Sequence, residues 1–250
     1  MPAESAMPAA SFARYFGSQA ESYDRMRPPY PEQAVDFVLA GRPPGRVLDL
    51  GAGTGKLTRT LLGRATEVVA VEPDDQMRAV LTEAAPRAEV LAGSAERLPL
   101  PDASVDAVFA GQAFHWFARP ATDQELARVL RPGGVVGLIW NLPDHTVPWV
   151  PELYRTIRQP GSPWSADYAD LDTALFTPAE SHWTSWRYQL PGLDGLLELV
   201  HTWSWVITRP PAEQRAIDQR VRILATRHAE LQGELIGFPH RTKAVRQYLR

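Results

Sequence analysis

Three glycines at alternate positions are the clearest candidates for ligand binding in this chain. In VLDLGAGTGKLT (47–58), Gly51, Gly53 and Gly55 follow a short apolar run and precede a segment with leucines at helical spacing. Glycine lets the backbone turn tightly and lets a ligand approach without interference from a Cβ atom. In sheets of parallel strands, ligands bind where the carboxyl ends of strands meet such turns. The pattern predicts a ligand-binding turn, with a purely structural tight turn as the alternative.

The spacing of these glycines limits which ligand would fit. A dinucleotide fingerprint, G-x-G-x-x-G, would require a third glycine at position 56, where this chain has Lys56. A phosphate-binding loop of the form G-x-x-x-x-G-K-[ST] is also absent from the sequence. The sequence therefore matches neither the dinucleotide fingerprint nor the phosphate-binding loop.

Two acidic residues stand where they could contact a nucleoside. Glu72 ends the apolar run EVVAVE (67–72), and a carboxylate at that point can accept hydrogen bonds from both hydroxyls of a ribose. Glu96 lies in GSAERLPLPDASVD (93–106), a polar segment that can place backbone groups and a carboxylate near an adenine edge. The alternatives are a solvated acid at a strand end and a simple connecting loop.

These residues require a sheet that brings several strand ends together. The predicted strands of the first half are 46–50, 67–72, 88–93, 105–111 and 135–140. Apolar runs of this kind are typical of parallel strands that are buried on both faces. Strands that alternate with helices give a doubly wound α/β sheet with right-handed crossovers. Two more strands are predicted at 182–190 and 234–239, and the predicted helices are 31–39, 75–84, 121–130, 192–201 and 211–231.

Composition narrows the class of protein further. The chain has 250 residues, of which 44% are hydrophobic and 22% charged, and a formal net charge of -3. This length, without a Gly/Ser- or Pro-rich linker, predicts one domain over 1–250. The acidic balance argues against a nucleic-acid binder. Basic residues gather near the C-terminus, where we expect a solvated end; they are His240, Arg241, Lys243, Arg246 and Arg250.

Cysteine usage and hydropathy bear on the compartment. The chain has no cysteine, which excludes disulfides and thiolate chemistry. Its first ten residues lack the features of a secretory signal, and no apolar run approaches the ~20 residues needed to cross a bilayer. We therefore expect a cytoplasmic protein without a membrane partner.

Four motifs together resemble class I S-adenosylmethionine-dependent methyltransferases. They are VLDLGAGTGKLT, VVAVEPDDQM, GSAERLPLPDASVDAV and ELARVLRPGGVVGLIW, in the order and spacing of that family. YDRMRPPYP and QAFHWF are similar to its small-molecule branch (methyltransferase type 11), which includes UbiE-like and trans-aconitate-methyltransferase-like enzymes. The resemblance implies a cofactor-binding core at 12–141 beneath an N-terminal helical cap. It also implies a seven-stranded, mainly parallel sheet with one antiparallel strand, and an acceptor pocket built from 142–250.

The resemblance implies S-adenosylmethionine as the cofactor, converted to S-adenosylhomocysteine, and it assigns contacts residue by residue. The residues implied to hold the methionine and ribose parts are Asp49, Gly51, Ala52, Gly53, Gly55 and Glu72. Those implied to surround the adenine are Pro73, Met77, Ser94, Ala95 and Glu96. Those implied near the sulfonium or over the cofactor are Gln112, Tyr15, Tyr23 and Tyr30.

Methyl transfer from a sulfonium is an in-line displacement. It requires a positioned acceptor and exclusion of water, and a general base only where the acceptor is not already ionised. His115 in QAFHWF is the candidate catalytic base, because imidazole titrates near neutrality; the alternative is that it only packs beside Trp116. With His115, we expect Trp116, Trp140 and Asn141 to line the acceptor pocket. The sequence predicts no metal site, because no histidine pair has metal-ligand spacing.

The predicted function is therefore methylation of a small molecule at oxygen, carbon or nitrogen by a monomer or homodimer. The tryptophans after residue 141 suit an apolar pocket for a hydrophobic acid, a phenol or a polyketide-like compound. A non-catalytic regulator that binds S-adenosylmethionine or S-adenosylhomocysteine is one alternative. An RNA methyltransferase is another, disfavoured by the acidic charge, and Lys56 disfavours an NAD-dependent dehydrogenase.

Overall fold

The computed structural model describes residues 24–157 and 171–250. In this part of the chain seven strands form one sheet in the order β3-β2-β1-β4-β5-β7-β6. The strands are β1 (Arg46–Leu50), β2 (Glu67–Val71), β3 (Glu89–Leu91), β4 (Val105–Gly111), β5 (Leu130–Pro143), β6 (Glu180–Pro191) and β7 (Leu235–Tyr248). Strands β1 to β5 pair in parallel, and β7 runs antiparallel to both of its neighbours. The predicted α/β sheet with one antiparallel strand is confirmed.

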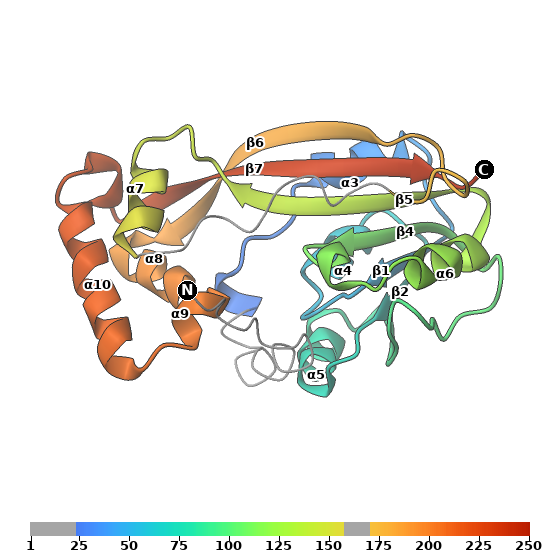
Figure 1. Cartoon of the computed structure of the whole chain (residues 1–250), viewed down its shortest axis with the longest axis horizontal. Helices are drawn as coiled ribbons and strands as arrows, with labels where there is room; N and C mark the ends of the chain where they lie inside the picture. Colours follow the sequence, from blue (N-terminus) through green and yellow to red (C-terminus); the bar gives the residue numbers. More distant parts are fainter. Residues whose placement is uncertain (1–23, 158–170) are drawn as a thin grey trace, which may run out of the picture.

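Two groups of helices flank the long strands β5, β6 and β7 (Figure 1). The first group accompanies β1 to β4 and comprises α3 (Glu32–Leu39), α4 (Lys56–Leu61), α5 (Asp75–Ala84) and α6 (Ala121–Val129). The second gathers at the other end of the long strands and comprises α7 (Trp149–Thr156), α8 (Gly192–His201), α9 (Ser204–Ile207) and α10 (Pro211–Ala225). Short 3-10 turns lie at η1 (Phe114–Trp116) and η2 (Ala229–Leu231). The long strands therefore connect the two groups of helices.

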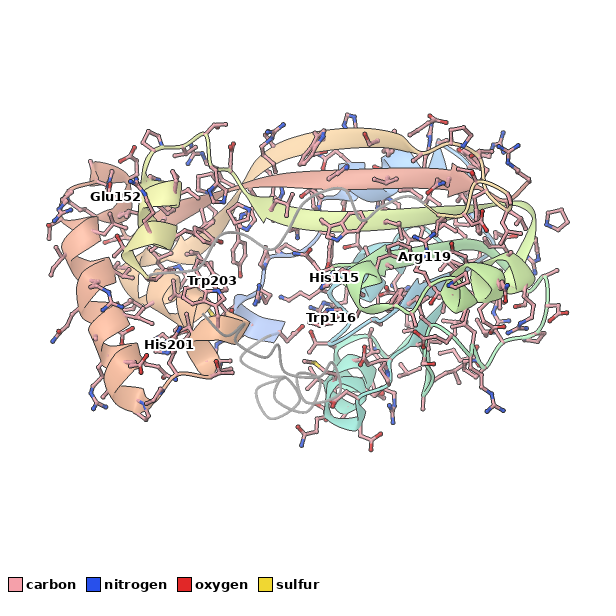
Figure 2. The ribbon with its side chains drawn as sticks, in the orientation of Figure 1. His115, Trp116, Arg119, Glu152, His201 and Trp203 are labelled. Atoms are coloured by element: carbon pink, nitrogen blue, oxygen red, sulfur yellow. The ribbon has the colours of Figure 1, made fainter. Side chains whose placement is uncertain are left out.

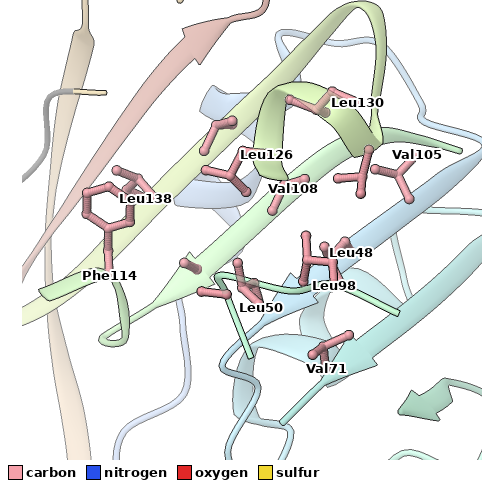
Figure 3. Packing of buried hydrophobic residues seen from close by; sticks show 14 of the residues in the cluster. Leu48, Leu50, Val71, Leu98, Val105, Val108, Phe114, Leu126, Leu130 and Leu138 are labelled. Carbon is pink, nitrogen blue, oxygen red and sulfur yellow. The ribbon is translucent and has the colours of Figure 1, made fainter. Parts of the chain in front are cut away.

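Alternation along the strands produces a core on each face of the sheet. In β1, Val47 packs with the cluster beneath α3 and α4, while its neighbour Leu48 packs with the cluster beneath α6. Figure 3 shows the second cluster, in which Leu48 and Val108 from the strands meet Leu126 from α6. Successive strand residues point to opposite faces, so burial on both faces requires apolar residues at every position. A third cluster joins α7, α8 and α10 around Trp149.

The last strand differs most from its prediction. The sequence predicted a strand at 234–239 followed by a solvated basic end, but β7 continues to Tyr248 between β5 and β6. Thr242, Ala244 and Val245 are buried in it, and the basic side chains alternate with them. The expectation of a solvated end was wrong. The basic residues alternate with buried residues in a strand that pairs with β5 and β6, and they made this segment look like an exposed end.

The fifth strand is also longer than predicted. Leu130 pairs with Val105 and Val135 pairs with Ala107, so the pairing register shifts across the RPGG segment. The predicted strand began at residue 135, and the RPGG segment before it is an irregularity within β5. Gly133 has a φ of 73°, the backbone conformation that glycine tolerates at such an irregularity.

Candidate active site

One large cavity of about 1480 Å³ runs along the carboxyl ends of the central strands. The ends of β1, β2 and β4 line one part of it, and α7, α8 and β7 contribute to the other part. Figure 2 shows His115 and Trp116 on one side and Trp203 on the opposite side, and all three line the cavity. Small-molecule pockets commonly measure about 300–1,000 Å³, so this cavity has room for two ligands side by side.

The glycine turn forms one wall of the cavity. Gly53 has a φ of 56°, and a Cβ built on it would meet no atom within 4 Å. Its N–H donates a hydrogen bond to Glu72 Oε2 at 2.9 Å. A backbone that is held in place and has open space at its surface is suited to close contact with a ligand.

Gly55 has a different task from the one that the resemblance implied. It is the N-cap of α4, with a φ of 84°, and a Cβ built on it would collide with Leu81 of α5. It is not among the residues that line the cavity. Gly55 therefore lets α4 and α5 approach each other, while Gly51, Ala52 and Gly53 face the cavity.

Glu72 is held in place by two backbone donors and still offers acceptor capacity. The N–H groups of Gly53 and Asp74 donate to its two carboxylate oxygens at 2.9 and 3.0 Å. The side chain is buried, and this burial raises the pKa of its carboxyl, against the effect of the two N–H bonds. A carboxylate has about four lone-pair positions, so about two remain for donors in the cavity. Two vicinal hydroxyls of a ribose would match them.

Asp49 lies at the base of the same wall. It is 1% exposed, and its Oδ2 accepts a hydrogen bond from Thr58 Oγ1 at 2.6 Å. Its Oδ1 has no hydrogen-bond partner among residues 24–157 and 171–250. Burial raises the pKa of this carboxyl to about 7, the Thr58 bond opposes the shift, and the charge of Glu72 adds to it. A buried acceptor without a partner is costly, so the site fits a ligand with a cationic N–H group such as an amino-acid ammonium.

A second group of residues forms the cavity wall next to Glu72. The expected adenine contacts that line it are Pro73, Met77, Ser94, Ala95 and Glu96. Asp74, which the sequence analysis did not single out, caps α5 by accepting hydrogen bonds from the N–H groups of Gln76 and Met77. Glu96 accepts a hydrogen bond from the Ala118 N–H at 2.9 Å. This bond fixes the segment after β3 against the loop that follows η1.

A hydrogen bond links Gln112 and Asn141 at the ends of β4 and β5. Gln112 has a φ of 54°, which is strained for a residue with a side chain, and its Nε2 donates to the Asn141 carbonyl at 2.9 Å. Asn141 Nδ2 donates to the Pro29 carbonyl, and Asn141 Oδ1 accepts from Thr242 Oγ1 at 2.6 Å. Both residues line the cavity, but the side-chain polar atoms of Asn141 are already bound within the protein.

Trp140 does not lie where the sequence analysis expected it. It is 7% exposed, belongs to the core cluster beneath α6 and is not among the residues that line the cavity. Its neighbour Asn141 does line the cavity, because adjacent strand residues point to opposite faces. The expectation that both would line the acceptor pocket was therefore wrong for Trp140.

His115 and Trp116 lie in η1, just after β4. Both line the cavity, with their ring centroids 4.7 Å apart, and Trp116 is 48% exposed. Burial lowers the pKa of His115 to about 4, so its imidazole is neutral at pH 7. A neutral imidazole can accept a proton, but one with so low a pKa is a weak base.

The first described residues of the chain contact the glycine turn and the cavity. Asp24 Oδ1 accepts hydrogen bonds from Thr54 Oγ1 and Arg59, both at 2.8 Å. Tyr30 lines the cavity and lies so close to Gly111 that only glycine fits there. Tyr15 and Tyr23, which were expected to cover the cofactor, lie outside the described residues.

The far part of the cavity is aromatic, and most of its residues were not assigned to a common site from the sequence. Its lining residues are Arg27, His145, Tyr154, Leu199, Trp203, Trp205, Phe238 and His240. The tryptophan-rich composition of the second half signalled an apolar pocket. No local motif signalled that segments this far apart in the chain meet at one place.

The described residues contain neither a metal-binding cluster nor a membrane-spanning helix. No group of three or more histidine, aspartate or glutamate side chains in the described part of the chain could hold a metal ion. Among the helices of that same part, none is long and apolar enough to cross a bilayer.

Comparison with known proteins was made against this geometry. The family described as "Methyltransferase domain" matches residues 48–138. An uncharacterized methyltransferase from Mycobacterium bovis is 43% identical over 238 residues, which cover 94% of this chain and 95% of the relative. An uncharacterized methyltransferase from Schizosaccharomyces pombe is 33% identical over 218 residues, which cover 81% and 83%.

Solved structures give the same result. A candidate type II methyltransferase from Anaeromyxobacter dehalogenans superposes with a TM-score of 0.66 at 25% identity, covering 89% of this chain and 97% of that one. The fold, the glycine turn with its two carboxylates, and relatives that match almost the whole chain agree. The chain belongs to the class I S-adenosylmethionine-dependent methyltransferases.

Proposed function

We propose that this enzyme transfers the methyl group of S-adenosylmethionine to a small molecule bound in the aromatic part of the cavity. The observation that carries the proposal is one continuous cavity of about 1480 Å³ that joins the carboxylates Asp49 and Glu72 to an aromatic wall. A methyl donor and its acceptor must share one space without a barrier between them.

The residues of the glycine turn would hold the cofactor. Asp49 Oδ1 would accept a hydrogen bond from the ammonium of its methionine part, and Glu72 would accept from the ribose hydroxyls. Pro73, Met77 and the segment from Ser94 to Glu96 would enclose the adenine. The bound cofactor supplies an electrophilic methyl group on a sulfonium.

Gln112 and His115 would act between the two parts of the cavity. Gln112 is rigid because its side chain is bound to the Asn141 carbonyl and its backbone is constrained, so it would fix the wall near the sulfonium. Neutral His115 would accept a hydrogen bond from the acceptor and orient it. Trp116, at the rim, would limit access of water.

Assembly and location are part of the same proposal. The net charge of -3 and the absence of cysteine suit a small-molecule enzyme in a reducing compartment. We place it in the cytoplasm as a monomer or homodimer, without a nucleic-acid or membrane partner.

The test is a transfer assay with purified protein, S-adenosylmethionine labelled in the methyl group and small-molecule extracts. The expected result is a labelled product that is strongly reduced with the Glu72→Gln variant and unchanged with Glu83→Gln, a matched change at an exposed position of α5. Tight binding of S-adenosylhomocysteine with no labelled product from any extract would instead favour a non-catalytic regulator. Labelled RNA in a parallel reaction with total RNA would contradict a small-molecule acceptor.

A further inference from the structure

The far part of the cavity contains a set of flat aromatic walls. The rings of Tyr154 and Trp203 stack with centroids 4.9 Å apart and an interplanar angle of 21°. His145 lies 5.1 Å from Tyr154, and Trp205 lies 5.7 Å from Trp203, centroid to centroid. Flat, rigid walls of this kind contact a planar ring system over a large area at little cost in side-chain entropy.

One buried histidine interrupts this aromatic surface. His240 is 5% exposed and lines the cavity from β7. Its ring stacks on Trp186, with centroids 5.2 Å apart, and Trp186 Nε1 donates to Thr242 Oγ1 at 2.8 Å. Two neighbouring side chains therefore fix the orientation of the imidazole.

The hydrogen bonding of His240 determines which nitrogen is available. Its Nδ1 lies 3.1 Å from the Phe238 carbonyl, and a carbonyl can only accept, so Nδ1 carries the proton. Burial lowers the pKa of His240 to about 4, so the ring is neutral and Nε2 holds a lone pair. Nε2 has no hydrogen-bond partner among residues 24–157 and 171–250. The side chain therefore offers the cavity one acceptor and no donor.

We propose that the acceptor is a planar aromatic molecule with a hydroxyl group that donates a hydrogen bond to Nε2 of His240. This inference rests on the proposed function and names its substrate class. A bound ring would bury this lone pair in the aromatic wall, and the lone pair then discriminates between ligands, because a ligand without a donor leaves it unpaired. A carboxylate presents only lone pairs to Nε2. Arg27 lines the same part of the cavity and donates to the Thr202 carbonyl at 2.9 Å, and its positive charge would attract a carboxylate, so the test includes a carboxylate probe.

The test is calorimetry on protein first saturated with S-adenosylhomocysteine. The probes are 2-naphthol, 2-methoxynaphthalene and 2-naphthoate, which share the ring system and differ in the polar group. We expect 2-naphthol to bind roughly fivefold to tenfold more tightly than 2-methoxynaphthalene, the loss that one neutral hydrogen bond produces. His240→Phe should bind the two probes within about twofold of each other, because it keeps a flat ring and removes the acceptor.

His182→Phe is the matched control. His182 lies on β6 away from the cavity and stacks on Phe37 with centroids 5.3 Å apart, a contact that phenylalanine preserves. This variant should discriminate between the probes as the wild type does. The wild-type preference for 2-naphthol stands as a test even if His240→Phe does not fold.

Three outcomes would overturn the inference. They are no binding of 2-naphthol, equal binding of 2-naphthol and 2-methoxynaphthalene by the wild type, and tighter binding of 2-naphthoate. Each can occur while S-adenosylhomocysteine binds normally, and the proposed function then stands. Failure of S-adenosylhomocysteine to bind in the first step would count against the proposed function itself.

Discussion

At the scale of single residues, Asp49 is the most informative group in the cavity wall that the glycine turn forms. One of its oxygens is bound to Thr58 and the other lacks a partner, in a position with 1% exposure. Burial raises the pKa of this carboxyl from its ordinary value of 3.8 to about 7. The native protein without ligand therefore holds more protons here than the unfolded chain at pH values between the two. A ligand ammonium favours the ionised form and lowers this pKa.

This shift makes ligand binding and stability depend on pH in opposite ways. The affinity for S-adenosylhomocysteine should increase by up to about tenfold per pH unit as the pH rises from about 5 toward 7. Over the same range the free protein should lose stability relative to Asp49→Asn, because the native carboxyl must give up its proton. Calorimetry and thermal unfolding of both proteins measure the two effects. A pH dependence that is identical in wild type and variant would show that Asp49 does not titrate in this way.

At the scale of elements, the turn between β1 and α4 separates binding from packing. Gly53→Ala places a methyl group in open space at a φ of 56°, with a strain of about 1–2 kcal/mol. Gly55→Ala adds a collision with Leu81. We expect Gly53→Ala to weaken S-adenosylhomocysteine binding more than Gly55→Ala does. Gly55→Ala should lower the melting temperature more than Gly53→Ala does. Equal effects on both quantities in the two variants would contradict this division.

A pair of threonines tests how the last two strands support the site. Thr242 and Thr184 are direct neighbours across β6 and β7. Thr242 Oγ1 donates to Asn141 and accepts from Trp186, whereas Thr184 Oγ1 is buried and has no hydrogen-bond partner in the described residues.

Valine at these two positions should therefore have different effects. Thr242→Val leaves the Oδ1 of buried Asn141 and the Nε1 of half-buried Trp186 without Thr242 as a partner. The loss costs about 1–3 kcal/mol and lowers the melting temperature by roughly 2–4 °C per kcal/mol. Thr184→Val should be neutral or stabilising, because it removes a buried polar atom that had no partner. Thermal unfolding checks both. A loss of stability in Thr184→Val equal to that in Thr242→Val would show that the hydrogen bonds are not the cause.

At the scale of the whole molecule, the part of the cavity around the glycine turn was predictable and the aromatic part was not. β1, β2 and β4 are apolar runs that end at turn residues, so their positions and the ligand edge follow from local pattern. β7 was predicted too short because Arg241, Lys243 and Arg246 alternate with buried residues in a strand between two others. The aromatic wall joins Tyr154, Trp203 and His240 from three distant segments, and such a meeting has no signature in local spacing.

The division of roles along the glycine turn shows the same limit. The resemblance to the family placed Gly55 with the ligand, and Trp140 was expected in the acceptor pocket. The geometry assigns Gly55 to helix packing and Trp140 to the core. A motif identifies the turn, but only the packing around each residue decides which of its members face the ligand.

The most direct test of the account is a calorimetric titration of S-adenosylhomocysteine into the wild type, Glu72→Gln and Glu83→Gln. The account predicts one site in the wild type, an affinity at least about tenfold weaker in Glu72→Gln because a charged acceptor for the ribose is lost, and wild-type affinity in Glu83→Gln. No heat and no thermal shift in the wild type, or equal binding by wild type and Glu72→Gln, would contradict it.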